Sequence, residues 1–355
     1  MKQYYSRSEK RMKCDWANLE ALPLSLILDK LKEHVEHVWF SAVCKNWQSI
    51  AKLNHQNHEF KPNTLPMLML PSNSVWKQAN TFSFIEMKQY PFRYQLCHNN
   101  PTVSVCGSSH GWLALLDVSK SVITLMNPFK DTPRIILPPL NSVNKVTLSA
   151  DPIANPDDYL VVAIYDGGGG NLAFIRRGQT VWTYVDTSKS SFIDVIFYKG
   201  MLFALNIRDK IVSFDIHRLN DSYDKVRTIT PNVVLEEKIG KCYGGDKYLV
   251  KSLKEELWMV RRCNRRLSRF HVCKLKLNVK SGKLEQMVKL TSLEDDILFL
   301  GAGDSVSTSR SYFSNSLLRD SIYFADGFKI YHVKTETAKH HCLYQKSPFW
   351  VMPHL

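Results

Sequence analysis

Cysteine and histidine side chains occur close together at two places in this chain, and such groups are common ligands of a zinc ion. One group is Cys263, His271 and Cys273, and the other is the run 340–342 of two histidines and a cysteine. Zinc sites usually supply their ligands as closely spaced pairs, and neither group has that spacing. We therefore expect these thiols to pack in the protein core, and the sequence predicts neither a metal nor another cofactor.

Catalytic patterns are also weak. The acidic runs 294–296 and 157–158 place carboxylates next to each other in sequence, where they rarely face one another as an acid and base pair must. The glycine run 167–170 is not followed by the Lys-Ser/Thr of a phosphate-binding loop, and no Gly-x-Ser-x-Gly motif occurs. The sequence predicts a non-catalytic protein, with a hydrolase as the enzymatic alternative.

Basic residues exceed acidic ones, with 47 Lys+Arg against 33 Asp+Glu and a net charge of +14. This balance favours acidic partners, and nucleic acid is one alternative, but the scattered positions of the charges disfavour it. Arginines could grip an acidic or phosphorylated protein through bidentate pairs, or could simply be solvated at a hairpin turn. The arginines that are candidates for such contacts are Arg208, Arg261, Arg262, Arg265 and Arg266.

The eight cysteines are irregularly spaced, without a Cys-x-x-Cys pair, and the first 13 residues are polar and charged. Both features disfavour secretion and predict reduced thiols in an intracellular protein of the nucleus, the cytoplasm or both. No stretch approaches the roughly 18 apolar residues of a membrane-spanning helix, so we expect no membrane partner.

Apolar residues between about 22 and 53 recur at helical spacing. Leu24, Leu28 and Leu31 share one face, and Pro23 stands where a helix can begin, because an N–H is not needed there. Roughly 40 residues cannot build a self-sufficient core, so the three short helices predicted here must pack on a partner or on the remaining chain. A second group has the same spacing and consists of Phe40, Val43, Cys44, Trp47, Ile50 and Ala51.

Short β-rich runs bounded by turn residues replace this pattern from about residue 60. They form meanders of three or four strands that recur about every 40–55 residues, which is typical of propeller blades. We predict a mainly β fold, a β-propeller with six blades, or seven as the alternative. The ring must close, and run 340–345 or 349–351 is expected to pair with the first strands near Met67.

The start of the chain resembles an F-box. Residues 16–31 look like the start of an F-box, and Val43-Cys44-Lys45-Asn46-Trp47 looks like its third helix, where a Val-Cys-x-x-Trp signature is typical. Related F-boxes often have Asp and Arg where Glu36 and Trp39 stand here. The remaining chain resembles the KIB-type propeller of plant F-box proteins, in fragments that keep the order of that family: 109–113, 125–129, 194–200, 248–252, 257–260, 299–301, 320–324 and 348–351.

This resemblance implies a substrate-recognition subunit of an SCF-type cullin E3 ubiquitin ligase. Its F-box would bind a Skp-type adaptor and, through it, a cullin, while propeller loops such as 166–171, 208–210 and 261–269 would bind an unknown target protein. The expected domains are a flexible N-terminus (1–15), the F-box (16–60) and the propeller (61–355). The residues expected to contact the adaptor are Leu22, Pro23, Leu26, Ile27, Leu31, Val43, Cys44 and Trp47. The alternative is that these residues pack on the propeller instead.

Overall fold

The chain divides into two compact units in a computed structural model: Met1–Thr64 together with Leu355, and Leu65–His354. The structure describes residues 15–57, 65–71, 78–83, 88–93, 103–165, 170–185, 191–215, 232–235, 245–264, 269–278, 284–313, 317–340 and 348–353. Residues 1–14 of the predicted flexible N-terminus lie outside this part of the chain.

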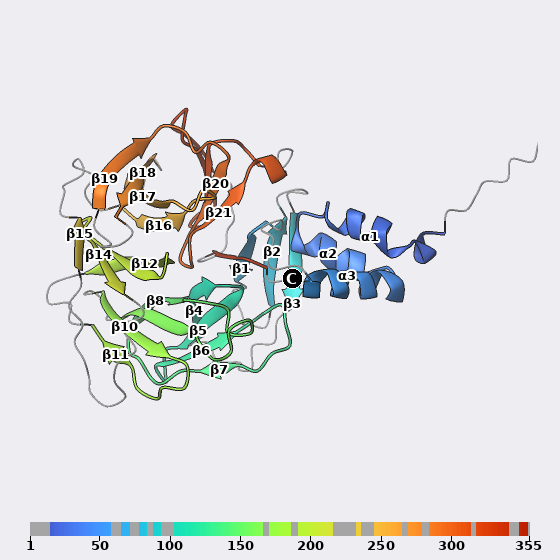
Figure 1. Ribbon diagram of the computed structural model, residues 1–355, viewed down its shortest axis with the longest axis horizontal. Coiled ribbons are helices and arrows are strands. Elements are labelled where there is room, and N and C mark those ends of the chain that lie inside the picture. Colours follow the sequence, from blue (N-terminus) through green and yellow to red (C-terminus); the bar gives the residue numbers. More distant parts are fainter. Residues whose placement is uncertain are drawn as a thin grey trace, which may run out of the picture. The chain divides into compact units, whose positions relative to one another are not determined.

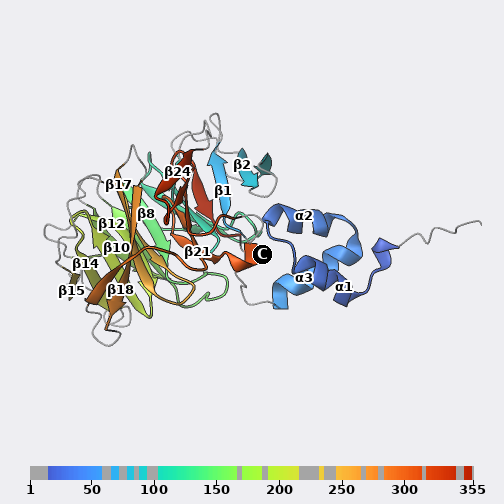
Figure 2. The same ribbon diagram turned by 90° about the horizontal axis from the view of Figure 1, so that it is seen from above.

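The first unit contains a short 3-10 helix, η1 (Trp16–Asn18), and three α-helices, α1 (Ala21–Leu28), α2 (His34–Ala42) and α3 (Lys45–Asn57). Helix α3 contacts both α1 and α2 (Figure 2). A capping box starts α2, because the Glu36 carboxylate accepts from the backbone N–H of Glu33 at 2.9 Å while the Glu33 side chain accepts from the N–H of Glu36. No helix in the described ranges is both long and apolar enough to cross a membrane.

The helix boundaries differ from the predicted ones in two ways. Pro23 is the third residue of α1 rather than its first, a position still within the first turn, where the backbone needs no N–H donor. The apolar repeat from Phe40 to Ala51 is not one helix, because α2 ends at Ala42 and α3 begins at Lys45. Phe40 and Trp47 nevertheless meet, with ring centroids 4.6 Å apart, because the two helices pack against each other.

The second unit is a six-bladed β-propeller, in which the described strands form six sheets around a common axis (Figure 1). The first sheet holds β1 (Met67–Pro71), β2 (Gln78–Ser83) and β3 (Lys88–Arg93). The second holds β4 (Val103–Ser109), β5 (Trp112–Asp117), β6 (Val122–Met126) and β7 (Ile135–Ile136). The third holds β8 (Val143–Leu148), β9 (Leu160–Tyr165), β10 (Asn171–Arg176) and β11 (Thr183–Tyr184).

The remaining sheets follow in chain order. The fourth holds β12 (Phe192–Tyr198), β13 (Met201–Asn206), β14 (Ile211–Asp215) and β15 (Asn232–Leu235), and the fifth holds β16 (Lys247–Lys251), β17 (Leu257–Asn264), β18 (Arg269–Leu277) and β19 (Leu284–Leu290). The sixth holds β20 (Asp296–Leu300), β21 (Val306–Ser309), β22 (Ser321–Phe324), β23 (Lys329–His332) and β24 (Thr337–His340), and a second 3-10 helix, η3 (Ser311–Phe313), follows β21. In this sheet β20 lies between β21 and β22 and pairs with β22 in parallel, a topology that the sequence did not predict.

The ring closes through β25 (Phe349–Val351), which joins the first sheet beside β1. The strands are antiparallel, and Met67 pairs with Val351. This confirms the second of the two predicted closing runs. Run 340–345 does not supply the closure within the described residues, since His340 belongs to the sixth sheet and residues 341–347 lie outside them.

The core fills the space between neighbouring blades, because successive side chains of a strand point to opposite faces of its sheet. In β9, Val161 and Ala163 pack with the second sheet, whereas Leu160, Val162 and Ile164 pack with the fourth. Each blade therefore needs apolar residues on both faces of its sheet, because it packs against a neighbour on either side. This explains the continuous apolar run of a strand such as β9. One edge strand of each sheet faces the axis: β25, β4, β8, β12, β16 and β21.

Candidate functional site

The helical unit leaves part of its apolar surface uncovered. Leu24, Leu28 and Phe40 form its buried centre. Leu22 and Leu26, one turn apart on α1, keep 70% and 55% of their surface exposed. Val43, between α2 and α3, is also 55% exposed. These three of the eight residues predicted to contact an adaptor are thus large apolar side chains that the described chain leaves more than half exposed.

The other predicted residues divide between surface and core. Ile27, Leu31 and Trp47 are partly buried against the centre of the helical unit. Cys44 is half-buried and Pro23 is exposed. The partly buried residues have a structural role in the unit whether or not a partner also touches them.

Hydrogen bonds attach the N-terminal segment to α3. The Trp47 indole N–H donates to the carbonyl of Trp16 at 2.9 Å. The Asn46 side-chain amide donates to the carbonyls of Ala17 and Leu19 at 3.1 and 3.0 Å. The backbone that precedes α1 is therefore held next to the Val-Cys-x-x-Trp segment.

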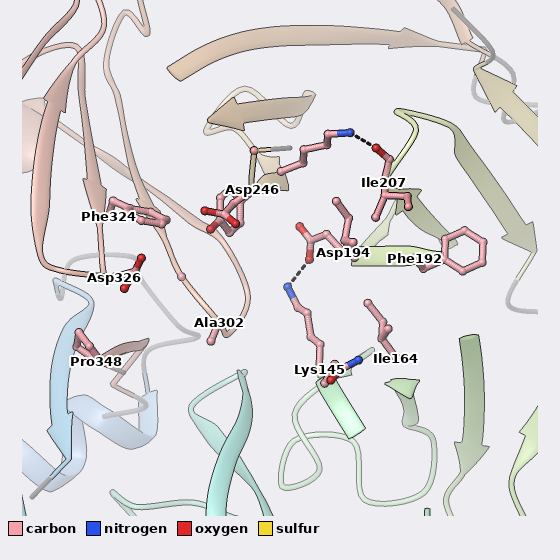
Figure 3. Close-up of a pocket in the computed structure, with 16 residues that line it drawn as sticks. Lys145, Ile164, Phe192, Asp194, Ile207, Asp246, Ala302, Phe324, Asp326 and Pro348 are labelled. Carbon is pink, nitrogen blue, oxygen red and sulfur yellow. Dashed lines mark hydrogen bonds and ion pairs between the residues drawn. The ribbon is translucent and has the colours of Figure 1, made fainter. Parts of the chain in front are cut away.

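A cavity of about 690 Å³ opens at the axis of the propeller (Figure 3). Its walls come from the first residues of β8, β12 and β16, from Ile164 near the end of β9, from the turns after β13 and β22, and from the segments that follow β20 and precede β25. The lining residues used below are Lys145, Ile164, Phe192, Asp194, Ile207, Asp246, Lys247, Tyr248, Phe324, Asp326 and Pro348.

A buried ion pair crosses between two blades within this cavity. Lys145 of β8 binds Asp194 of β12, and their side chains are only 8% and 1% exposed (Figure 3). The Lys145 ammonium also donates to the Gly303 carbonyl at 3.0 Å, and Asp194 accepts from the Leu249 backbone N–H at 2.6 Å. The pair therefore connects the third, fourth, fifth and sixth blades and is satisfied without a ligand.

A second charged group lies on the opposite wall, where Asp246 and Asp326 are near Phe324 (Figure 3). The Arg262 guanidinium is 3.0 Å from Asp246 and 3.6 Å from Asp326, and it lies over the Phe324 ring at 4.7 Å. Arg262 is 3% exposed, whereas the Asp326 side chain is 78% exposed. Burial raises the pKa of the nearby Tyr248 hydroxyl above its ordinary value.

The predicted arginine cluster has a different location from the expected surface loop. Arg261 and Arg262 lie inside β17, each 3% exposed, and carboxylates neutralise both. The partner of Arg261 is Asp209, 2.6 Å away, which also binds Lys247 at 2.9 Å. A charge buried in a blade must be paired, and these pairs prevent Arg261 and Arg262 from reaching an external acidic partner.

Of the remaining predicted arginines, Arg208 lies in the exposed turn between β13 and β14, directly after the cavity residue Ile207. Arg265 and Arg266 lie outside the described residues, as do residues 166–169 of another predicted contact loop. Arg208 is thus the predicted arginine that the structure places on an accessible surface near the axis.

The candidate catalytic and metal-binding residues have local structural partners. The Asp295 carboxylate accepts from the hydroxyls of Ser309 and Ser311 at 2.5 and 2.6 Å, and these bonds help to lower its pKa despite partial burial. Asp296 is buried, which raises its pKa, and it accepts from the Leu253 backbone N–H at 2.8 Å. The carboxylates of Asp295 and Asp296 therefore bind different neighbours and do not form an acid and base pair with each other.

Cys263 and His271 do approach each other, with Sγ and Nδ1 3.2 Å apart. Burial and nearby cationic side chains lower the pKa of His271. No group of three or more His, Cys, Asp or Glu side chains among the described residues is arranged to hold a metal ion, and two members of the run 340–342 fall outside them.

Sequence reasoning missed the cavity residues Lys145, Asp194, Asp246 and Asp326. The first two are single charges within apolar strands, and such a charge must find a buried partner. That pattern could have signalled an interior ion pair. It could not have identified the partner, because Lys145 and Asp194 belong to different blades.

Comparisons with known proteins agree with the resemblance seen in the sequence. A family model described as KIB1-4 beta-propeller matches residues 81–345. A putative F-box protein of Arabidopsis thaliana is 24% identical over 330 residues, covering 88% of this chain and 85% of the relative. The Arabidopsis F-box protein SKIP23 is 23% identical over 351 residues, covering 84% and 80%.

A third relative, an F-box/kelch-repeat protein of the same plant, is 24% identical over 335 residues and covers 88% of this chain and 83% of its own. Among solved structures, a chain of the nidogen/laminin complex aligns with 81% of this chain and 97% of its own, at 10% identity and a TM-score of 0.45.

Proposed function

The chain belongs to the KIB1-4 β-propeller family, and from that premise and its F-box relatives we propose that it is the substrate-recognition subunit of an SCF-type cullin E3 ubiquitin ligase. The helical unit binds a Skp-type adaptor, which connects it to a cullin. The propeller binds the target protein, and the chain itself performs no catalysis. We place this activity in the nucleus, the cytoplasm or both.

The exposed apolar surface of α1 is the observation that carries this proposal. Leu22 and Leu26 lie on one face because residues four apart on a helix are neighbours. They are 70% and 55% exposed, although the same helix buries Leu24 and Leu28 completely or almost completely. A helix with apolar residues on both sides fits a position between the core of its own unit and a second protein.

Burial of these two leucines would make a measurable contribution to an interface. Complete burial of a leucine side chain stabilises by about 1.5–3 kcal/mol, so covering the exposed parts of Leu22 and Leu26 is worth roughly 1–2 kcal/mol each. Such contacts near the centre of an interface dominate its affinity. Placing a carboxylate at both positions removes this gain and adds the cost of burying charge.

The test is capture of a purified Skp-type adaptor by the full chain and by the variant Leu22→Asp/Leu26→Asp. We expect the double variant to bind at least about thirtyfold more weakly, which corresponds to the loss of about 2 kcal/mol. Both side chains point away from the buried centre, so the helical content should not change. Circular dichroism should confirm this, because a variant with lost helix would leave the capture result without meaning.

Leu318→Asp is the matched control, because Leu318 is an exposed leucine of the propeller, at 46%. This variant adds the same charge to a comparable surface and should capture the adaptor like the unchanged chain. Equal capture by all three proteins, or no capture by the unchanged chain, would refute the proposed adaptor surface.

A further inference from the structure

The charged groups in and around the axial cavity differ in accessibility. The cations Lys145, Lys247, Arg261 and Arg262 have side chains 8%, 5%, 3% and 3% exposed, and each is paired with a carboxylate. Among the carboxylates that line the cavity, Asp194 is 1%, Asp246 is 28% and Asp326 is 78% exposed. A molecule that enters the cavity can therefore reach the carboxylate of Asp326, while the four paired cations are buried.

We propose that this cavity binds a basic side chain, lysine or arginine, of the target protein, with Asp326 as the residue that recognises its charge. The inference rests on the proposed function, in which the propeller receives the target, and adds the chemistry of one recognition site. It also reverses the expectation from composition, since the net charge of +14 suggested an acidic partner.

Asp326 has the capacity for such a contact. The 3.6 Å between its Oδ2 and Arg262 is longer than a hydrogen bond, so the carboxylate keeps acceptor capacity toward the cavity. Its position is fixed by the turn after β22, where the Phe328 N–H donates to the Ala325 carbonyl at 2.9 Å and the Phe328 ring is fully buried. A carboxylate on a rigid turn loses little conformational freedom when it pairs with a cation.

Apolar groups supply the surface that a long basic side chain also requires. Ile207 at the rim of the cavity is 53% exposed, and Pro348 lines the wall, whereas the lining residues Ile164 and Phe192 are 1% and 2% exposed and pack mainly in the core between two blades. Lysine and arginine place apolar stems along such surfaces while the charged end reaches a polar group. The volume of about 690 Å³ lies within the roughly 300–1,000 Å³ of ligand pockets, large enough for a side chain with part of its backbone.

Strand β1 begins at the end of the first blade that is remote from the cavity. Met67, at the start of β1, pairs with Val351, whereas Pro348, before the start of the same partner strand, lines the cavity. The chain thus enters the first sheet at the strand end remote from the cavity.

The experiment is selection of a random-peptide library displayed on phage against the immobilised full-length chain, followed by affinity measurements on the selected sequences. We expect one position of the bound peptides to be enriched in lysine and arginine. Replacing that residue by norleucine, which keeps the apolar stem without the charge, should weaken binding about tenfold, the effect of one charge-assisted hydrogen bond.

Asp326→Asn should weaken binding of the basic peptide by a similar factor and leave the norleucine peptide unchanged. Asp158→Asn is the matched control, because the Asp158 side chain is also 78% exposed but does not line the cavity. It should bind both peptides like the unchanged chain. Enrichment of acidic or neutral residues, absence of any peptide binding, or equal affinity of Asp326→Asn and the unchanged chain would overturn the proposal.

These outcomes are independent of adaptor capture, because the peptide assay contains no adaptor. Basic-peptide binding without adaptor capture would remove the ligase proposal and leave the specificity of the cavity in place. Adaptor capture without basic-peptide binding would do the reverse.

Discussion

Replacement of Trp350 by alanine is expected to weaken the closure of the propeller ring. Trp350 is 1% exposed, meets the Phe299 ring edge-on at a centroid distance of 4.9 Å, and donates its indole N–H to the Leu300 carbonyl at 3.0 Å. Its own carbonyl accepts from the Ser108 hydroxyl at 2.5 Å. The residue thus links the first blade to the second and the sixth.

The expected cost is about 3–5 kcal/mol in free energy of unfolding, the usual range for truncating a buried tryptophan. Urea denaturation followed by circular dichroism measures this value. A cavity anywhere in the core has a similar cost, however, so hydrogen exchange must show where the structure opens. Because β25 holds β1, the amides of Met67–Pro71 should exchange faster in the variant.

Trp182→Ala is the matched control for this experiment. Trp182 is 3% exposed and donates its indole N–H to the Pro138 carbonyl at 2.9 Å, but it lies beside the outer strand β11 of the third blade. It should lose similar stability without faster exchange in β1. The same exchange pattern in both variants, or a loss below about 1 kcal/mol for Trp350→Ala, would refute the role of Trp350 in ring closure.

Three further predictions follow from buried titratable groups. Lys145→Met should cost about 3–5 kcal/mol because it leaves Asp194 buried without its cation, and adding Asp194→Asn should restore part of the loss in urea titrations; an unchanged midpoint for the single variant would contradict this. Burial lowers the pKa of His37, so the unfolded chain binds its proton more readily, and the helical unit should lose stability as pH falls below about 6.5; melting curves of His37→Gln should lack that dependence. Burial raises the pKa of Cys106 to about 12, so iodoacetamide at pH 8 should leave it unmodified in the folded protein and label the half-exposed Cys44, as mass spectrometry can show.

Sequence patterns predicted the propeller because each blade repeats short β-rich runs that end in turn residues. Runs such as Val122–Met126, Leu160–Tyr165 and Met201–Asn206 combine β-branched or aromatic residues with turn residues at their ends, and they are strands at those bounds. Phe349–Val351 was a credible closing strand for the same reason, and because a propeller needs one. The number of blades followed from the spacing of these runs.

Strands with a mixed pattern were missed. Leu284–Leu290 alternates half-buried and exposed residues at the outer edge of its blade, so its apolar signal is weak. The two-residue strand Ile135–Ile136 is too short to show any period. The break between α2 and α3 was also hidden, because Phe40, Val43 and Trp47 keep helical spacing across it.

The candidate sites depend on contacts that local patterns do not contain. The exposed face of α1 could be predicted, because Leu22 and Leu26 share one side of a helix that also carries Leu24 and Leu28. The cavity could not, because Lys145, Asp194 and Asp326 meet only when separate blades surround the axis. The buried positions of Arg261 and Arg262 have the same origin, since their partners Asp209 and Asp246 precede them on other strands or turns.

Hydrogen exchange of the full chain, free and with a purified Skp-type adaptor, tests the central claim most directly. The claim is that the apolar surface of the helical unit binds the adaptor while the propeller stays available for a target. We predict slower exchange in Ala21–Leu28 and in the segment around Val43 upon complex formation, and unchanged exchange in β12, β16 and β22 around the cavity. Protection of those cavity strands with no change in Ala21–Leu28 would contradict this account.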